Sequence, residues 1–161
     1  MARLRITLID LKSLQPLRWL QVGVLVTLFC ASVVHAELAG DLASVSRDAQ
    51  AFGATTSSQT LQGVATVYTQ SIPNGVTVRQ YVDAAGLVFG VAWEGPVLPD
   101  FERLLGASFQ TYMATVRQQR RGVAIQTPEL VIESGGMMRS FIGRAYLPSK
   151  LPVNLSAQDI R

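Results

Sequence analysis

The feature that most constrains the fold is a pair of β-rich runs joined at Pro73-Asn74-Gly75, in the stretch GVATVYTQSIPNGVTVRQYV. Proline fixes φ at a negative value, so Pro73 and Asn74 suit a type I turn, and Gly75 suits the left-handed residue of the bulge that follows. Pairing Ile72 with Val76 places apolar side chains on a single face: Val64, Tyr68, Ile72, Val76, Val78 and Val82. Thr69, Arg79 and Asp83 fall on the other face. The sequence therefore predicts an antiparallel hairpin with one apolar and one mixed face.

A further strand is predicted over residues 87–94, LVFGVAWE, after a turn at residues 83–86 with the Asp and Gly positions that type I prefers. Leu87, Phe89, Val91 and Trp93 are expected on one face, and Val88, Gly90 and Ala92 on the other. A run that is apolar on both sides is typical of a central strand covered twice. Its small face allows another element to approach closely.

Two segments have helical spacing. The first is GDLASVSRDAQAFGA, with Asp41 as N-cap and Gly53 as stop. The second begins at Asp100, and its apolar residues follow the i, i+3, i+4 pattern for four turns, to Val116. The sequence predicts one short and one long helix.

The remaining segments complete the predicted fold. The polar TTSSQT, residues 55–60, is expected to be a loop. ELVIES, Gly135-Gly136 and MMRSFIGRAYL are expected to form a second hairpin that turns at the two glycines, and PSKLPVNLSAQDIR a proline-punctuated tail. The predicted order is α-β-β-β-α-β-β, an α+β domain with an antiparallel sheet of about five strands: a three-stranded meander plus a C-terminal hairpin.

Residues 1–36 have the order of a secretory signal. Basic residues come first, the apolar run VGVLVTLFCASVV follows, and Val34 and Ala36 are the small residues of a cleavage site. We predict cleavage between Ala36 and Glu37, and a periplasmic or secreted product. The alternative is an uncleaved membrane anchor, because the apolar stretch extended back to Trp19 approaches the roughly 18 residues that indicate a membrane span. Phe29 precedes Cys30 where a lipobox needs a small residue, so no lipid is expected there.

Cleavage would change the available chemistry, because the only Cys (Cys30) and the only His (His35) lie in the removed segment. Four of the 14 Lys and Arg residues and one of the 11 Asp and Glu residues leave with it, which makes ten of each and a formal charge of zero. The basic pI then belongs to the signal and indicates no nucleic-acid partner. Residues 37–161 form one domain without disulfides, stabilised by a packed core.

One stretch of the predicted domain resembles a known family. NGVTVRQYVDAAGLVFGVAWEGPVLPDFERLLGASFQTY, together with SGGMMRSFIGRAYLP, is similar to the family designated domain of unknown function 2844. The most specific portion is VAWEGP followed by PD and LLG, in residues 91–106. The resemblance implies a small exported protein of Gram-negative bacteria. It implies no activity and no catalytic residues.

Glu94 and Asp100 are the candidate catalytic pair. A glycosidase-like mechanism needs two carboxyl groups roughly 5–10 Å apart across a cleft, one of them with a raised pKa. The structural interpretation is favoured, since Asp100 stands where a helix N-cap belongs and Glu94 ends a strand.

Other catalytic classes are less well served. Without His or Cys a catalytic triad is excluded, and a Ser-Lys dyad would depend on Lys150, the sole lysine after cleavage. No EF-hand spacing and no phosphate-binding glycine motif occurs in the sequence. We therefore expect no metal and no cofactor.

Two surfaces are candidate binding sites. Arg117, Arg120 and Arg121 crowd the predicted end of the long helix, where they either bind an anionic partner or simply match the helix dipole. Arg79 and Tyr81 lie on the mixed sheet face, which is a candidate partner surface if nothing covers it and core if something does.

The function these observations favour is that of a non-enzymatic exported accessory protein, which binds an envelope or secreted protein and contacts the membrane only through the segment before cleavage. A carboxylate-dependent hydrolase using Glu94 and Asp100 is the first alternative. A periplasmic domain that stays anchored at its N-terminus is the second.

Overall fold

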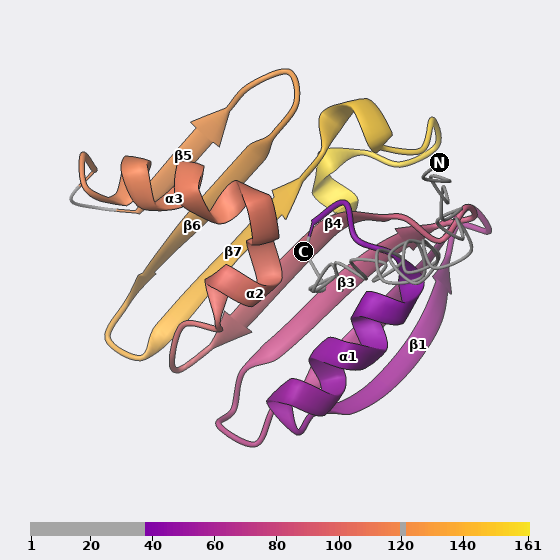
Figure 1. Ribbon diagram of the computed structural model, residues 1–161, viewed down its shortest axis with the longest axis horizontal. Coiled ribbons are helices and arrows are strands. Elements are labelled where there is room, and N and C mark those ends of the chain that lie inside the picture. The colour runs from indigo at the N-terminus through magenta and orange to yellow at the C-terminus, as the bar shows by residue number, and fades with distance from the viewer. Residues whose placement is uncertain (1–37, 120–121) are drawn as a thin grey trace, which may run out of the picture. The chain divides into compact units, whose positions relative to one another are not determined.

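The computed structural model describes residues 38–119 and 122–161, which form an α+β domain around one antiparallel sheet (Figure 1). The sheet has seven strands in the order β1-β2-β3-β4-β7-β6-β5. The predicted signal, its cleavage site at Ala36 and Glu37, and the pair Arg120 and Arg121 lie outside the described residues. The strands are β1 (Thr55–Leu61), β2 (Ala65–Ser71), β3 (Thr77–Asp83), β4 (Val88–Gly95), β5 (Val123–Gln126), β6 (Val131–Met137) and β7 (Ser140–Tyr146).

The prediction of about five strands is wrong in number, because β1 and β5 were missed. Residues 55–60 were expected to be a loop, yet they belong to β1, which pairs with β2 along its whole length. Its side chains are exposed on both faces except for Leu61, so no apolar alternation marks it as a strand. Val123–Gln126 is short, and only Val123 and Ile125 of its residues are buried.

The helices lie on one face of the sheet, called here the helix face (Figure 1). α1 (Leu42–Phe52) begins and ends as predicted, since the Asp41 side chain accepts a hydrogen bond from Ser44 N and Gly53 is left-handed. The predicted long helix is interrupted. It consists of α2 (Phe101–Leu105), a 3₁₀ turn η1 (Gly106–Ser108) and α3 (Phe109–Val116). Gly106 has φ 51° and ψ −123°, a conformation that a helix interior does not contain and that glycine adopts without steric cost.

The turn of the C-terminal hairpin lies three residues further along the chain than predicted. Gly135 and Gly136 belong to β6, where they pair with Ile142 and Phe141 of β7. The chain reverses instead at Met138 and Arg139, with φ 46° and 68°. Positive φ at both central residues is the geometry of the two-residue turn that matches the twist of a hairpin. The glycine pair was a misleading turn signal.

β4 is the central strand and is buried on both faces, as predicted. Two side-chain assignments are wrong, however, those of Phe89 and Val88. β3 pairs Tyr81 with Gly90 but Val82 with Val88, so Phe89 is an extra residue in a bulge. Phe89 therefore lies on the outer face, and Val88 lies on the helix face together with Val91 and Trp93.

The face opposite the helices, called here the outer face, is partly covered by the C-terminal segment, residues 147–161. This segment contains two 3₁₀ turns, η2 (Pro148–Lys150) and η3 (Ala157–Asp159). Its Leu155 and Ile160 are buried in one cluster with Tyr81 and Phe89. A Cβ on Gly90 would lie 3.0 Å from Ile160 Cδ1, which confirms that the small face of β4 admits a close neighbour. No helix within residues 38–119 and 122–161 is long and apolar enough to cross a membrane.

Candidate functional site

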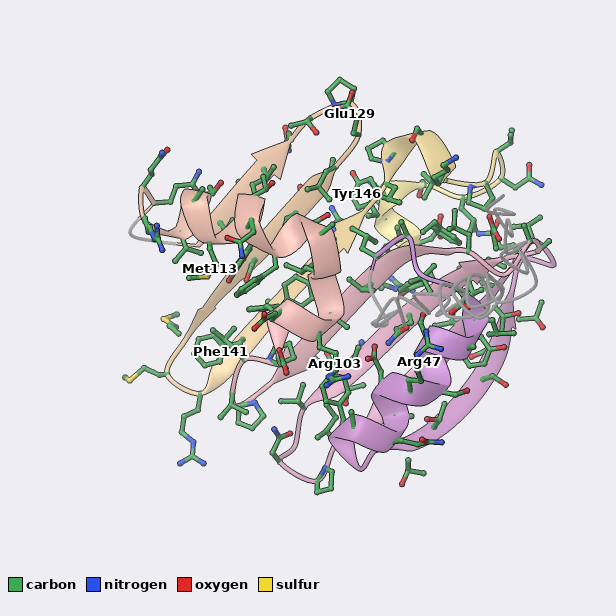
Figure 2. All side chains as sticks on the ribbon, in the orientation of Figure 1. Arg47, Arg103, Met113, Glu129, Phe141 and Tyr146 are labelled. Atoms are coloured by element: carbon green, nitrogen blue, oxygen red, sulfur yellow. The ribbon has the colours of Figure 1, made fainter. Side chains whose placement is uncertain are left out.

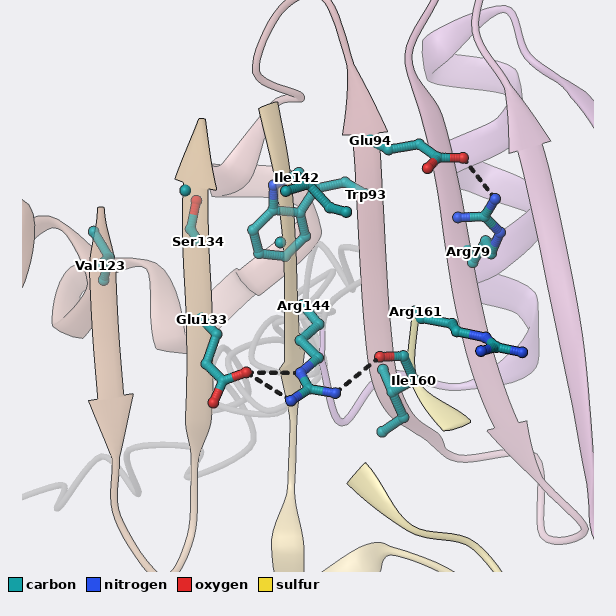
Figure 3. Close-up of a pocket in the computed structure, with 12 residues that line it drawn as sticks. Arg79, Trp93, Glu94, Val123, Glu133, Ser134, Ile142, Arg144, Ile160 and Arg161 are labelled. Atoms are coloured by element: carbon teal, nitrogen blue, oxygen red, sulfur yellow. Dashed lines mark hydrogen bonds and ion pairs between the residues drawn. The ribbon is translucent and has the colours of Figure 1, made fainter. Parts of the chain in front are cut away.

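A groove lies on the outer face where the cover provided by the C-terminal segment stops. It runs across β3, β4, β7 and β6, and Ile160 and Arg161 form one wall (Figure 3). Its volume is about 400 Å³. That volume is within the range of about 300–1,000 Å³ usual for ligand pockets. The lining residues are Arg79, Trp93, Glu94, Val123, Glu133, Ser134, Gly135, Ile142, Gly143, Arg144, Ile160 and Arg161.

The centre of the groove is an exposed apolar side chain beside a gap. Ile142 of β7 is 62% exposed, and its partner across the ladder is Gly135 of β6. Within residues 38–119 and 122–161, no atom beyond those of Gly135 and its chain neighbours lies within 4 Å of the position that a Cβ on Gly135 would occupy. Glycine at this position therefore leaves one flank of Ile142 open to a ligand atom.

At the base of the groove, Gly143 has no side chain, and the Trp93 ring occupies the space that one would fill. A Cβ at Gly143 would lie 2.7 Å from Trp93 Cε2, closer than side-chain carbons approach one another. The Trp93 ring packs edge-on against Phe101, with ring centroids 4.9 Å apart, and is fully buried. A larger residue at position 143 would thus have to displace the tryptophan.

One rim of the groove is the ion pair between Arg79 of β3 and Glu94 of β4. Arg79 Nη2 lies 2.6 Å from Glu94 Oε1 (Figure 3). Thr77 is the direct partner of Glu94 in the ladder, and Ala92 is the partner of Arg79, so the pair is diagonal. Both side chains remain partly exposed. Such a pair contributes about 0.2–1 kcal/mol to stability.

The other rim is the ion pair between Glu133 of β6 and Arg144 of β7, which are direct ladder partners. Arg144 Nε and Nη2 lie 2.8 and 2.7 Å from Glu133 Oε2. The third nitrogen, Nη1, donates to the carbonyl oxygens of Ala157 and Ile160, the latter at 3.4 Å. Arg144 thereby ties the groove to the C-terminal segment (Figure 3).

The sequence-predicted site residues lie in different places. Arg79 and Glu94 meet at the groove, whereas Asp100 is not among the residues that line it. The Asp100 side chain accepts a hydrogen bond from Arg103 N at 3.1 Å and so caps α2, as the favoured interpretation predicted. Arg117 follows α3 directly.

Tyr81 is buried, because the C-terminal segment covers it. Its hydroxyl donates to the carbonyl oxygen of Arg161 at 2.8 Å and accepts from the Arg161 N–H at 2.9 Å. Burial raises the pKa of the Tyr81 hydroxyl. The mixed face was predicted to be either a covered part of the core or an uncovered surface. Tyr81 belongs to the covered core, whereas Arg79 lies where the face is uncovered and lines the groove.

A buried carboxyl group on the helix face was missed by sequence reasoning. Asp48 of α1 accepts a hydrogen bond from Gln80 Nε2 at 2.8 Å, and burial raises its pKa to about 7. Positive charges at Arg103 and Arg47, both on the helix face in Figure 2, oppose this rise only in part. Gln70 Nε2 donates to the carbonyl oxygen of Val45 beside it. Asp48 is buried, but the helical pattern of α1 was assigned from its apolar residues alone, so a charged residue among its buried positions was not predicted.

The family assignment follows from a comparison with protein-family models. The model described as "Protein of unknown function (DUF2844)" matches residues 34–160. The chain belongs to this family. The match confirms the resemblance seen in the sequence, and the matched range includes every strand and helix of the described fold. Searches of curated proteins and of solved structures found no match.

The groove of this DUF2844 domain therefore has to be interpreted from its own chemistry. It combines an apolar centre with two rims whose charges are already paired within the fold. Among the residues that the structure describes, no group of three or more His, Cys, Asp or Glu side chains is placed to hold a metal ion. An apolar centre with a polar rim is the usual anatomy of a protein-binding surface.

Proposed function

We propose that this protein is an exported, non-enzymatic binding module of the cell envelope, and that the groove binds a segment of a protein partner. The observation that carries the proposal is the exposure of Ile142 at the centre of a groove with charged rims. A concave site with an apolar lining and a few polar groups around it is the usual composition of a binding pocket. Export is supported by the signal-like pattern of residues 1–36.

The two ion pairs favour binding over chemistry. Each carboxylate of the rim is held by a guanidinium, Glu94 by Arg79 and Glu133 by Arg144. A carboxylate that acts on a substrate has to reach the reacting atoms, and here each one is already bound to a side chain of the fold. Paired rim charges instead select the register and orientation of a partner.

The test is capture from envelope extracts by the immobilised protein, followed by calorimetry with the purified partner. Ile142→Asp is expected to weaken binding by at least tenfold, because it places a charge at the apolar centre of the interface. Val153→Asp is the matched control, since Val153 is 101% exposed and does not line the groove. Equal affinities for the two variants would remove the groove from the proposal.

Export has a separate test. Fractionation of the source cells should place the protein in the periplasm or the medium, and its intact mass should correspond to a chain that begins at Glu37. A full-length mass in the membrane fraction would establish the anchored alternative instead.

The hydrolase alternative remains a prediction, and it has a specific observation in its favour, because Glu94 lines the groove. Screening against glycosidic and ester substrates is its first test. If an activity is found, Glu94→Gln and Asp100→Asn should each abolish it. Turnover that survives both substitutions excludes the carboxylate mechanism.

A further inference from the structure

The two edges of the sheet differ in how they are protected. At the β5 edge, the Gln119 side chain is hydrogen-bonded to both backbone groups of Ala124. Ala124 N donates to Gln119 Oε1 at 3.0 Å, and Gln119 Nε2 donates to the Ala124 carbonyl oxygen at 3.4 Å. The strand has only four residues. A short edge with occupied backbone groups resists the addition of another strand.

The β1 edge has none of these protections. Thr55–Leu61 is seven residues long and pairs with β2 without a register shift. The strand, TTSSQTL, contains no charge and no proline. Apart from its ladder with β2, none of the backbone groups of Thr55–Thr60 is hydrogen-bonded to another described residue. Long, uncharged and regular, β1 presents a row of N–H and C=O groups that no described residue pairs with, and such a row accepts a further strand.

We propose that β1 pairs with β1 of a second copy of this chain, antiparallel about a two-fold axis at Ser58. In this register Thr56 lies opposite Thr60, Ser57 opposite Gln59, and Ser58 opposite itself. Every apposed side chain is uncharged, so self-pairing brings no like charges together, and Thr and Ser pairs across antiparallel strands are stabilising. The two sheets become one continuous sheet, an isologous contact of the commonest symmetry.

The structure favours a second copy over a foreign strand. The strand has no charge with which to select a partner of opposite charge, and its side chains are exposed on both faces, so no described residue obstructs an identical strand. Stable interfaces bury about 1,200–2,000 Å² and involve roughly 20–30 residues on each side, so a contact through one strand of seven residues is small. The dimer is therefore weak, and its population rises with concentration.

The first experiment is sedimentation velocity on the purified full chain, from low micromolar to millimolar concentration. The wild type should shift from monomer to dimer over this range. Ser58→Lys places two like charges at the axis and should leave only monomer. Gln126→Lys, an exposed position on the opposite edge, is the matched control and should dimerise as the wild type does. Unchanged melting temperatures establish that both variants fold.

A mixing experiment tests the register. Ser58→Lys and Ser58→Asp should each be monomeric alone and should form a heterodimer when mixed, because opposite charges then meet at the axis. A wild type that is monomeric at every concentration overturns the proposal, and so does a Ser58→Lys variant that dimerises like the wild type. Failure to restore association on mixing overturns the register.

Discussion

The helix face and the outer face of the sheet differ in what covers them. The helix face is closed by α1, α2 and α3, which bury a continuous apolar cluster that includes Trp93 and Leu104. The outer face is closed only where the C-terminal segment crosses it, around Tyr81 and Ile160, and beyond that segment it forms the groove. One sheet thus combines a face that stabilises the fold with a face that is left partly free to bind.

The largest effect that separates the faces should come from Trp93→Ala. Trp93 is 1% exposed and packs against Phe101 on the helix face. Removal of a buried tryptophan leaves a cavity and should lower the free energy of unfolding by about 3–5 kcal/mol. Urea titration followed by circular dichroism measures the loss.

Ile142→Ala is the counterpart of this change on the open face, and its cost should stay within about 0.5 kcal/mol because the side chain is mostly in solvent. A cost close to that of Trp93→Ala would show that the open face is part of the core after all.

Substitutions in the covered part of the outer face should lower the free energy of unfolding about as much as those on the helix face do. Ile160 is fully buried against Gly90, so Ile160→Ala should cost about 2–5 kcal/mol. The matched control is Val153→Ala in the same segment, which should be nearly neutral because Val153 is fully exposed. If both substitutions are neutral in urea titrations, the C-terminal segment detaches from the sheet at little cost, and the groove has no fixed wall.

Local chemistry explains which parts of this arrangement were predictable. The Pro73-Asn74-Gly75 turn and the caps Asp41 and Asp100 act over a few residues, so the sequence alone indicates them. The central position of β4 followed from its apolar residues on both faces. These features involve neighbours along the chain.

The features that were missed depend on partners far along the chain. β1 is a strand because its backbone is hydrogen-bonded to β2. Phe89 lies on the outer face because the pairing of β4 with β3 contains a bulge. The rim formed by Glu133 and Arg144 exists only in the register of a hairpin that turns at Met138 and Arg139, three residues further along the chain than a turn at the glycine pair. A turn placed wrongly by a few residues was enough to conceal half of the groove.

The helix face should also differ from the outer face in its response to pH, through Asp48. Its pKa of about 7 in the folded protein lies above the ordinary 3.8, so the folded state binds the proton more tightly than the unfolded state does. The contribution of Asp48 to stability is then greatest below pH 3.8, falls as the pH rises toward 7, and is constant above that value. From pH 5 to pH 8 the loss should be about 2–3 kcal/mol.

The control for this prediction is Asp48→Asn, which keeps an acceptor for Gln80 Nε2 and cannot ionise. Urea midpoints of the variant should be flatter with pH than those of the wild type. Parallel pH profiles for the two proteins would show that Asp48 is not the source of the dependence.

The smallest effect should be found at the rim of the groove, and its size separates a binding role from a structural one. Arg79 and Glu94 are partly exposed, so a double-mutant cycle with Arg79→Ala and Glu94→Ala should give a coupling of about 0.2–1 kcal/mol that shrinks in high salt. If these charges orient a partner, the same substitutions should slow its association far more than they change folding. A coupling free energy as large as the cost of breaking a buried ion pair, about 3–5 kcal/mol, would instead show that the rim stabilises the fold. The outer face beyond the C-terminal segment would then contribute to stability as the helix face does.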